Sequence, residues 1–252
     1  MKHVDKKAVS ETKDAPKQIT MYERNLMGKV IYHLAMFFTK ILVRLRYKGQ
    51  ENLPADSNYI VAANHQSFFD GLWLMGGVPR KHFATFSCMA GADLEDDYGL
   101  IGKVMLRVGR AILVDRNGNP IRGLIAAKKV LEAGDIVMIH PEGTRTHDGK
   151  IGEMMNGAAY LAQKTGIPII PAYINGAYEI FSRYMPVPYP IHLRRLKRKP
   201  LTIEFGEPIY AGAYATKDEI MAAVSGWLHA KEAIALAEKD PELANLKSNR
   251  LP

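Results

Sequence analysis

A histidine and an aspartate that could cooperate in proton transfer stand five residues apart, just after an apolar stretch. His65 and Asp70 belong to the sequence Asn-His-Gln-Ser-Phe-Phe-Asp, which follows the apolar run Tyr59–Ala63. Imidazole gains and loses protons near neutral pH, and a carboxylate can orient it. On one continuous helix the two side chains would point about 140° apart, because each residue turns by about 100°. We therefore predict that His65 lies in a loop and Asp70 in the first turn of a helix.

The same spacing also fits a purely structural role. Ser67 and Asp70 have the pattern of a capping box, in which Ser67 would be the N-cap and Asp70 the third helical residue. In that interpretation Asp70 only stabilises the end of the helix, and His65 is an ordinary loop histidine. The motifs elsewhere in the chain favour the chemical interpretation.

A second polar motif, His-Pro-Glu-Gly-Thr-Arg at residues 140–145, follows another apolar stretch. Gly143 allows close approach of the backbone, and the planar guanidinium of Arg145 suits phosphate oxygens. Two weaker motifs are the apolar run from Gly109 that ends at Arg116, and Ile167–Pro171, which carries two prolines. Taken singly, a glycine turn with a solvated arginine would explain residues 140–145, and the other two motifs carry little information.

Strands and helices alternate through the part of the chain that carries these motifs. Apolar runs predict strands at Tyr59–Ala63, His82–Ser87, Ala111–Val114, Asp135–His140, Ile167–Ile174 and Leu201–Phe205. Amphipathic segments predict helices at Phe68–Gly76, Leu100–Val108, 119–133, Glu153–Thr165 and Thr216–Glu238. This order is typical of an α/β layered domain with a mostly parallel central sheet flanked by helices. The motifs then lie where open α/β sheets bind ligands, at the carboxyl ends of strands.

The two ends of the chain differ from this single domain, which we place at residues 48–238. Residues 1–20 are rich in lysine and are predicted to form a disordered tail without a secretory signal, and residues 239–252 a C-terminal tail. Residues 21–47 are predicted to form an amphipathic helix that associates with a membrane, because basic residues flank its apolar stripe. Packing on the protein's own core is the alternative. The most apolar part, Val30–Val43, is too short to span a bilayer.

Charge and composition narrow the function classes. The net charge of +8 suits nucleic acid, an anionic membrane surface or phosphorylated small molecules. We expect no nucleic-acid partner, because the sequence shows no recognition helix, aromatic platform or zinc finger. The single cysteine, Cys88, cannot form an internal disulfide and is expected to be a buried structural thiol. We also expect no metal, because the histidines lack ligand spacing such as His-Glu-x-x-His.

Together and in this order, the four motifs resemble the sequence blocks of the glycerolipid acyltransferase family, which includes 1-acylglycerol-3-phosphate acyltransferases. The first block there is Asn-His-x4-Asp, matched by Asn64, His65 and Asp70, and the third, Pro-Glu-Gly-Thr-Arg, is matched in full. The runs that end at Arg116 and Pro171 correspond to the second and fourth blocks. One position departs from the family: many members have Lys where this chain has Asn156.

The resemblance implies transfer of an acyl chain from acyl-CoA or acyl carrier protein to the free hydroxyl of 1-acylglycerol 3-phosphate, giving phosphatidic acid. His65 would be the base and Asp70 its orienting partner, without a cofactor. Binding of the acceptor's glycerol phosphate would fall to Arg116, Glu142, Gly143, Thr144 and Arg145, with Asn64 and Pro171 in supporting positions.

Several alternatives stay open at this point. The acceptor could be another lyso-lipid, such as a lysophospholipid or a lyso-ornithine lipid, or glycerol 3-phosphate. A non-enzymatic adaptor on a membrane surface would keep the same fold. In each case we expect a peripheral or monotopic membrane protein that faces the cytoplasm, with the anionic membrane surface, the lyso-lipid and the acyl donor as its partners.

Overall fold

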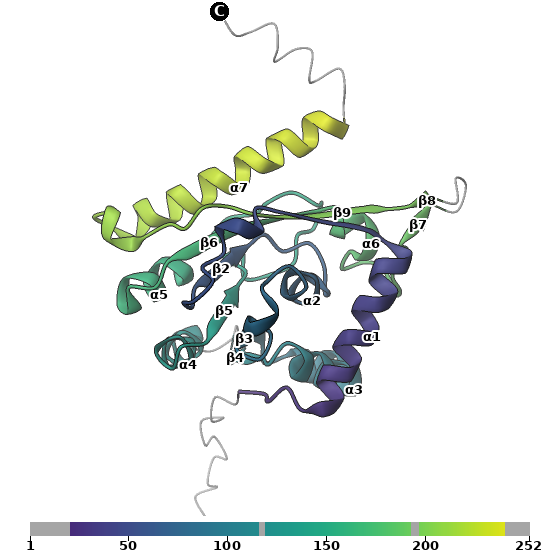
Figure 1. The fold of residues 1–252 in the computed structure, drawn as a ribbon, viewed down its shortest axis with the longest axis horizontal. Coiled ribbons are helices and arrows are strands. Elements are labelled where there is room, and N and C mark those ends of the chain that lie inside the picture. Colours follow the sequence, from purple (N-terminus) through teal and green to yellow (C-terminus); the bar gives the residue numbers. More distant parts are fainter. Residues whose placement is uncertain (1–20, 116–118, 193–196, 240–252) are drawn as a thin grey trace, which may run out of the picture.

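The computed structural model describes residues 21–115, 119–192 and 197–239. Its centre is a 7-stranded sheet with the strand order β1-β9-β6-β2-β5-β3-β4, and a 2-stranded sheet of β7 and β8 lies beside it (Figure 1). Neighbouring strands of the large sheet run parallel, apart from β6 and β9, which are antiparallel. The prediction of an α/β fold with a mostly parallel sheet is confirmed.

The bounds of the elements show how closely strands and helices alternate. The strands are β1 Arg44–Lys48, β2 Ile60–Ala63, β3 Phe86–Gly91, β4 Ile112–Val114, β5 Ile136–Ile139, β6 Ile169–Asn175, β7 Ile191–His192, β8 Lys197–Arg198 and β9 Pro200–Phe205. The helices are α1 Leu26–Leu42, α2 Asp70–Met75, α3 Leu94–Val108, α4 Pro120–Glu132, α5 Gly157–Thr165, α6 Ala177–Phe181 and α7 Lys217–Lys239.

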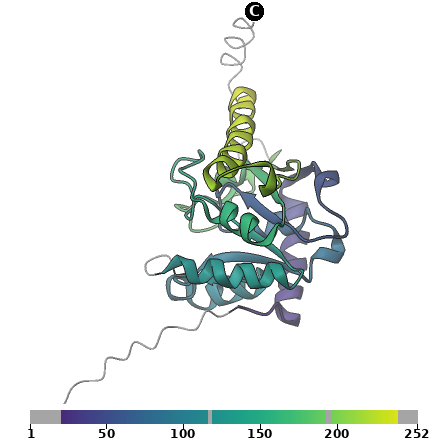
Figure 2. The ribbon, with the colours of Figure 1, turned by 90° about the vertical axis from the view of Figure 1, so that its left-hand side faces the viewer.

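The sheet separates two hydrophobic cores. Successive residues of β2 point to opposite faces, so Val61 and Ala63 belong to one core and Ile60 and Ala62 to the other. Helices α1, α2, α3 and α6 contribute to the first core, and α4, α5 and α7 to the second. Figure 2 shows α1, in purple, on the side of the strands away from α4 and α5. Strand β2 is therefore buried on both faces, and the loop that follows it starts from the core of the sheet.

Helix α1 is amphipathic, but much of its apolar surface is exposed. Asn25 caps its start, with the side-chain oxygen 2.9 Å from the backbone nitrogen of Gly28. The helix buries Gly28, Tyr32 and Met36 against the domain. Its exposed large apolar residues are Leu26, Met27, Val30, Leu34, Phe37, Phe38, Ile41 and Leu42. Among the described residues, no helix has both the length and the apolar character needed to cross a membrane.

Some predicted bounds are wrong for identifiable reasons. The helix expected over residues 21–47 ends at Leu42, and β1 follows, because Leu45 and Tyr47 alternate with charged residues and pair with β9. The strand expected at His82–Ser87 begins only at Phe86. His82 instead lies in a 3-10 turn. Its Nδ1 is 3.0 Å from Tyr59 Oη, and its Nε2 is 3.0 Å from the Ala55 carbonyl oxygen.

Candidate active site

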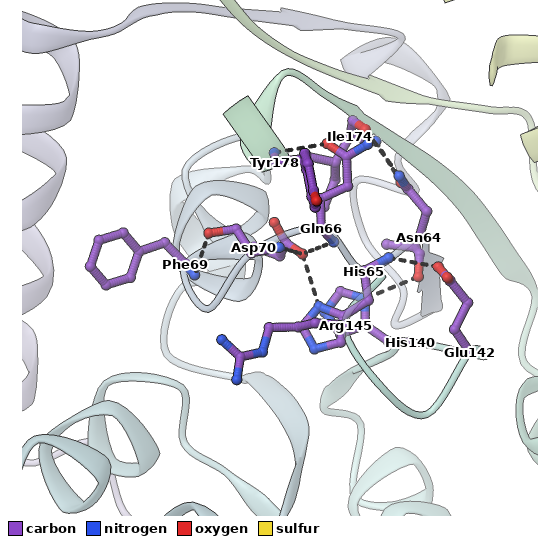
Figure 3. A network of polar contacts seen from close by, with 12 residues as sticks. Asn64, His65, Gln66, Phe69, Asp70, His140, Glu142, Arg145, Ile174 and Tyr178 are labelled. Atoms are coloured by element: carbon purple, nitrogen blue, oxygen red, sulfur yellow. Dashed lines mark hydrogen bonds and ion pairs between the residues drawn. The ribbon is translucent and has the colours of Figure 1, made fainter. Parts of the chain in front are cut away.

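Two neighbouring parallel strands bring the first and third sequence motifs together. In the register of β2 and β5, Ala62 lies beside Ile139, so the segments that begin at Asn64 and His140 leave the sheet side by side. Figure 3 shows the side chains of these two segments converging at this edge. The carboxyl ends of parallel strands are where such sheets hold their ligands.

His65 and Asp70 meet as the sequence spacing predicts. His65 lies in the loop after β2, Asp70 is the first residue of α2, and His65 Nδ1 is 2.9 Å from Asp70 Oδ2. The same oxygen accepts hydrogen bonds from the backbone nitrogens of Gln66 at 2.7 Å and Ser67 at 2.8 Å. The bond from Ser67 is the return half of the capping box, although the helix begins two residues later than predicted, at Asp70. The carboxylate therefore holds the loop and the imidazole at once.

Burial sets the protonation of the pair. Asp70 is fully buried, and this desolvation raises the pKa of its carboxyl to about 6, against the opposing influence of His140 and of the Ser67 and Gln66 N–H groups. Above that pH the carboxylate is ionised and only accepts hydrogen bonds, so the proton between the two residues is then on His65 Nδ1. Nε2 is then the nitrogen of His65 that can take a proton from another molecule.

The backbone of His65 is fixed by the third motif. Its N–H donates to Glu142 Oε1 at 2.8 Å, and its carbonyl accepts from the backbone nitrogen of Thr146 at 2.8 Å. The second oxygen of Glu142 accepts from Gly152 N at 2.9 Å. Both oxygens of Glu142 thus accept a backbone N–H group, so Glu142 holds the backbone of His65 in place. Its predicted contact with the acceptor stays a prediction.

Gly143 turns the third motif toward the cavity. Its φ of +68° is in the left-handed region, and a Cβ there would lie 2.3 Å from Met155 Cε. Glycine avoids both the strain and the clash. Gly143, Thr144 and Arg145 all line the cavity that His65 faces. Their binding of the acceptor stays a prediction.

Asn64 and Pro171 are the two residues that the resemblance placed in supporting positions. The Asn64 amide accepts from Ile174 N at 2.7 Å and donates to Ile174 O at 3.0 Å, so it joins the end of β2 to β6 as a supporting residue. Pro171 is buried within β6, beside Ala62 in the register, and does not line the cavities described below. The structure thus places Pro171 in the core of the sheet.

A cavity of about 420 Å³ opens beside His65. Its charged lining includes Arg145 and Arg183 together with Asp93 and Asp97. Its apolar lining includes Leu72, Cys88, Met105, Leu106, Val108 and Met138. A second cavity of about 260 Å³, with a mostly apolar lining, also reaches His65. The imidazole therefore lies between charged groups and apolar walls.

The arginines of this cavity were predicted only in part. Arg145 is present, with Nη2 2.9 Å from Tyr98 Oη and its guanidinium 5.7 Å from the Phe68 ring centre. Arg116 lies outside the described residues. Arg183 was not predicted, because it follows α6 without a recognisable motif. Its Nη1 donates to the Arg145 carbonyl at 3.0 Å and to His147 Nε2 at 2.9 Å.

A metal ion could in principle use His65, Asp70 and His140, because a ligand atom of each lies within 4.8 Å of the others. The two imidazoles, however, are stacked with ring centres 3.8 Å apart and planes at 3°. Nitrogen lone pairs lie in the ring plane, so those of two parallel rings do not converge on one ion. The arrangement fits proton transfer better than metal binding.

Replacing Asp70 with Asn should change the pH dependence of stability. A folded-state pKa of about 6, raised above the unfolded value, means that stability from this carboxyl is complete below about pH 4 and is lost as the pH rises through 6. Asn does not titrate, so D70N should gain relative to the wild type by about 3 kcal/mol between pH 4 and pH 8. Urea denaturation at several pH values measures this; a difference that does not change with pH would contradict it.

Replacing Glu142 with Ala should destabilise the protein, because it leaves the N–H groups of His65 and Gly152 without their acceptor. We expect a loss of about 1–3 kcal/mol in urea denaturation, and a smaller loss for E142Q, which keeps one acceptor oxygen. The matched control is E153A, since Glu153 is exposed. Equal midpoints for E142A and E153A would show that these bonds do not hold the loop.

Comparison with known proteins agrees with this geometry. The chain is 28% identical over 165 residues to 1-acyl-sn-glycerol-3-phosphate acyltransferase alpha of Mus musculus, covering 64% of this chain and 56% of that protein. It is 26% identical over 227 residues to an uncharacterised protein of Mycobacterium tuberculosis, covering 78% of this chain and 61% of the other. These matches thus span less than two thirds of either relative.

A solved structure resembles the fold. The 1-acyl-sn-glycerophosphate acyltransferase PlsC from Thermotoga maritima superposes with a TM-score of 0.66 at 25% identity, covering 84% of this chain and 80% of that one. The family model named Acyltransferase matches residues 44–175, which is just over half of the chain. This range contains the His65–Asp70 pair and the third motif, residues 140–145. The chain belongs to the acyltransferase family.

Proposed function

We propose that this protein transfers an acyl chain from an acyl thioester to the free hydroxyl of a 1-acylglycerol 3-phosphate-like lyso-lipid. The observation that carries the proposal is the contact of His65 with buried Asp70, 2.9 Å apart, beside a cavity that Arg145 and Arg183 also line. The family membership and the names of the related proteins support the same activity.

The proposed reaction uses His65 as base and then as acid. Nε2 takes the proton of the acceptor hydroxyl while the oxygen attacks the thioester carbonyl carbon, giving a tetrahedral oxyanion. The C–S bond then breaks, the ester forms, and the imidazolium returns its proton to the departing thiolate. Asp70 keeps the proton on Nδ1 and stabilises the imidazolium throughout. The substrate alcohol takes the place that a serine has in a hydrolase triad.

The acceptor's phosphate would lie near the two guanidinium groups. Arg145 and Arg183 line the cavity with His65, and a guanidinium can donate two parallel hydrogen bonds to phosphate oxygens. Holding the phosphate there would place the free hydroxyl near His65, and such positioning contributes strongly to rate. Arg116 stays a candidate for the same role on the resemblance alone.

A second acceptor class deserves a direct comparison because carboxylates line the same cavity. Asp93 and Asp97 would repel a phosphate but attract an amine, and Asp93 Oδ1 is buried without a hydrogen-bond partner among the described residues. A lyso-lipid whose headgroup carries both a negative and a positive group would satisfy both pairs. This observation favours such a headgroup as the alternative to 1-acylglycerol 3-phosphate.

We further propose that the protein works on a membrane surface and reaches it through α1. Helix α1 is in contact with α3 where Gly28 approaches the backbone of Arg107, and α3 also carries the exposed apolar residues Leu100 and Ile101. Exposed Lys29 and Lys40 add positive charge that attracts anionic headgroups. Because α3 also lines the cavity, a lipid could pass from this surface to His65.

Activity assays test the base and the phosphate site together. Purified protein is given acyl-CoA or acyl carrier protein thioesters and a panel of lyso-lipids, and products are identified by mass. H65A should lower kcat/KM by about 10³-fold, since it removes the proton acceptor. Full turnover by H65A would show that another group is the base.

R145Q and R183Q should raise KM for a phosphate-bearing acceptor about 10-fold, and should have little effect on a monoacylglycerol, which has no phosphate. The matched control is R80Q, because Arg80 is exposed and is not one of the residues that line the cavity. Equal effects on both acceptors would contradict phosphate binding by these arginines. Faster turnover of a zwitterionic lyso-lipid would favour the alternative acceptor.

Membrane binding should depend on the exposed face of α1. Replacing Leu34 and Phe37 with Glu should weaken binding to anionic phospholipid vesicles by about 10-fold or more, because each change removes apolar contact and adds negative charge. The control replaces Ile234 and Leu236 of α7, which are similarly exposed. Co-sedimentation measures the bound fraction. If both double variants pellet as the wild type does, α1 is not the membrane contact.

A further inference from the structure

A second histidine lies directly against the catalytic candidate. His140 follows β5, and the parallel register with β2 brings it next to the loop that carries His65. The two imidazole rings stack face to face, with centres 3.8 Å apart and an angle of 3° between their planes. Both rings line both cavities, so they form one continuous wall of the site.

The hydrogen bonding of His140 identifies its protonated nitrogen. Nδ1 is 3.0 Å from the carbonyl oxygen of Ala63, which can only accept, so Nδ1 carries the hydrogen. Burial, followed by the nearby His65, lowers the pKa of His140 to about 3. His140 is consequently neutral at the pH where His65 would act, and a second positive charge does not form beside it.

Several groups around His65 hold it in place besides His140. Asp70 holds Nδ1 from α2, Glu142 holds the backbone nitrogen from the loop after β5, and Arg145 lines the cavity beside it. One hydrogen bond at Nδ1 still allows the ring to tilt about that bond. A flat ring packed on one face prevents the tilt, because tilting would break the stacked contact.

We propose that His140 is a positioning residue. Its ring is held by the hydrogen bond to the Ala63 carbonyl, and it keeps the His65 ring oriented with Nδ1 toward Asp70 and Nε2 toward the cavity. The proposal rests on the proposed function, because it assumes that His65 is the base. The neutral ring also lets His65 alone take the proton during turnover. An imidazolium on His65 then lies over an aromatic face, which attracts a cation.

Three variants of His140 separate the stacked ring from its hydrogen bond. H140F keeps a flat ring and loses the bond to Ala63, whereas H140L fills a similar volume without a ring, and H140A removes both. We expect kcat to fall about 3-fold in H140F and by about 30-fold or more in H140L and H140A, with KM for both substrates nearly unchanged. The control H192F makes the same change at exposed His192 of β7.

Ring proton shifts of His65 in carbon–proton NMR spectra give a readout that does not need turnover. A stacked neighbour displaces these signals, so the displacement should persist in H140F and disappear in H140L and H140A. The pH profile of kcat/KM should shift in H140L, because the stacked ring of His140 no longer covers one face of the His65 ring. Unfolding temperatures identify any variant that fails to fold, and H140F then carries the comparison with H192F.

Each outcome decides the proposal. Wild-type kcat and unchanged His65 shifts in H140L would overturn it. An H140F variant as slow as H140L would also overturn it, because the ring face would then not be what matters. If the wild type transfers no acyl group, the proposed function fails, while the NMR comparison still tells whether His140 orders the His65 ring.

Discussion

The geometry of the site depends on the buried carboxylate of Asp70. Asp70 has no exposed surface, and it accepts one imidazole N–H and two backbone N–H groups through a single oxygen. These bonds fold the loop back onto the first turn of α2 and fix which nitrogen of His65 can act. Burial opposes this arrangement by favouring the protonated acid. The hydrogen bonds to Asp70 therefore stabilise a buried negative charge, and that charge orients the His65 ring.

The parallel sheet makes that arrangement possible. Strands β2 and β5 are parallel neighbours, so the loops that follow them lie side by side. The His65 N–H donates to Glu142, and the Thr146 N–H donates to the His65 carbonyl. The same register stacks His140 on His65. Asn64 adds a third strand by bonding to both backbone groups of Ile174 in β6. Three strands therefore position one imidazole, and the arginines reach the cavity from the loops beyond them.

The sequence predicted the parts of this account that repeat with a regular period or that follow a motif. The alternation of strands and helices, the loop position of His65 and the helical position of Asp70 all follow from local patterns. The edge strand β1 was missed because its apolar residues continue the stripe of α1, and only pairing with β9 makes it extended. The backbone contacts of Glu142 could not be predicted, because its partners are 77 and 10 residues away in the sequence. Arg183 could not be predicted, since only the tertiary fold brings it to the cavity.

The central claim is that Asp70 holds the proton of His65 on Nδ1 and leaves Nε2 to act as base. Nitrogen-15 NMR of the histidine-labelled full chain tests this directly, because protonated and unprotonated ring nitrogens resonate at distinct positions. At pH 8 the account predicts that His65 has a protonated Nδ1 and an unprotonated Nε2, and that D70N loses this preference. A wild-type His65 with its proton on Nε2 would contradict the account.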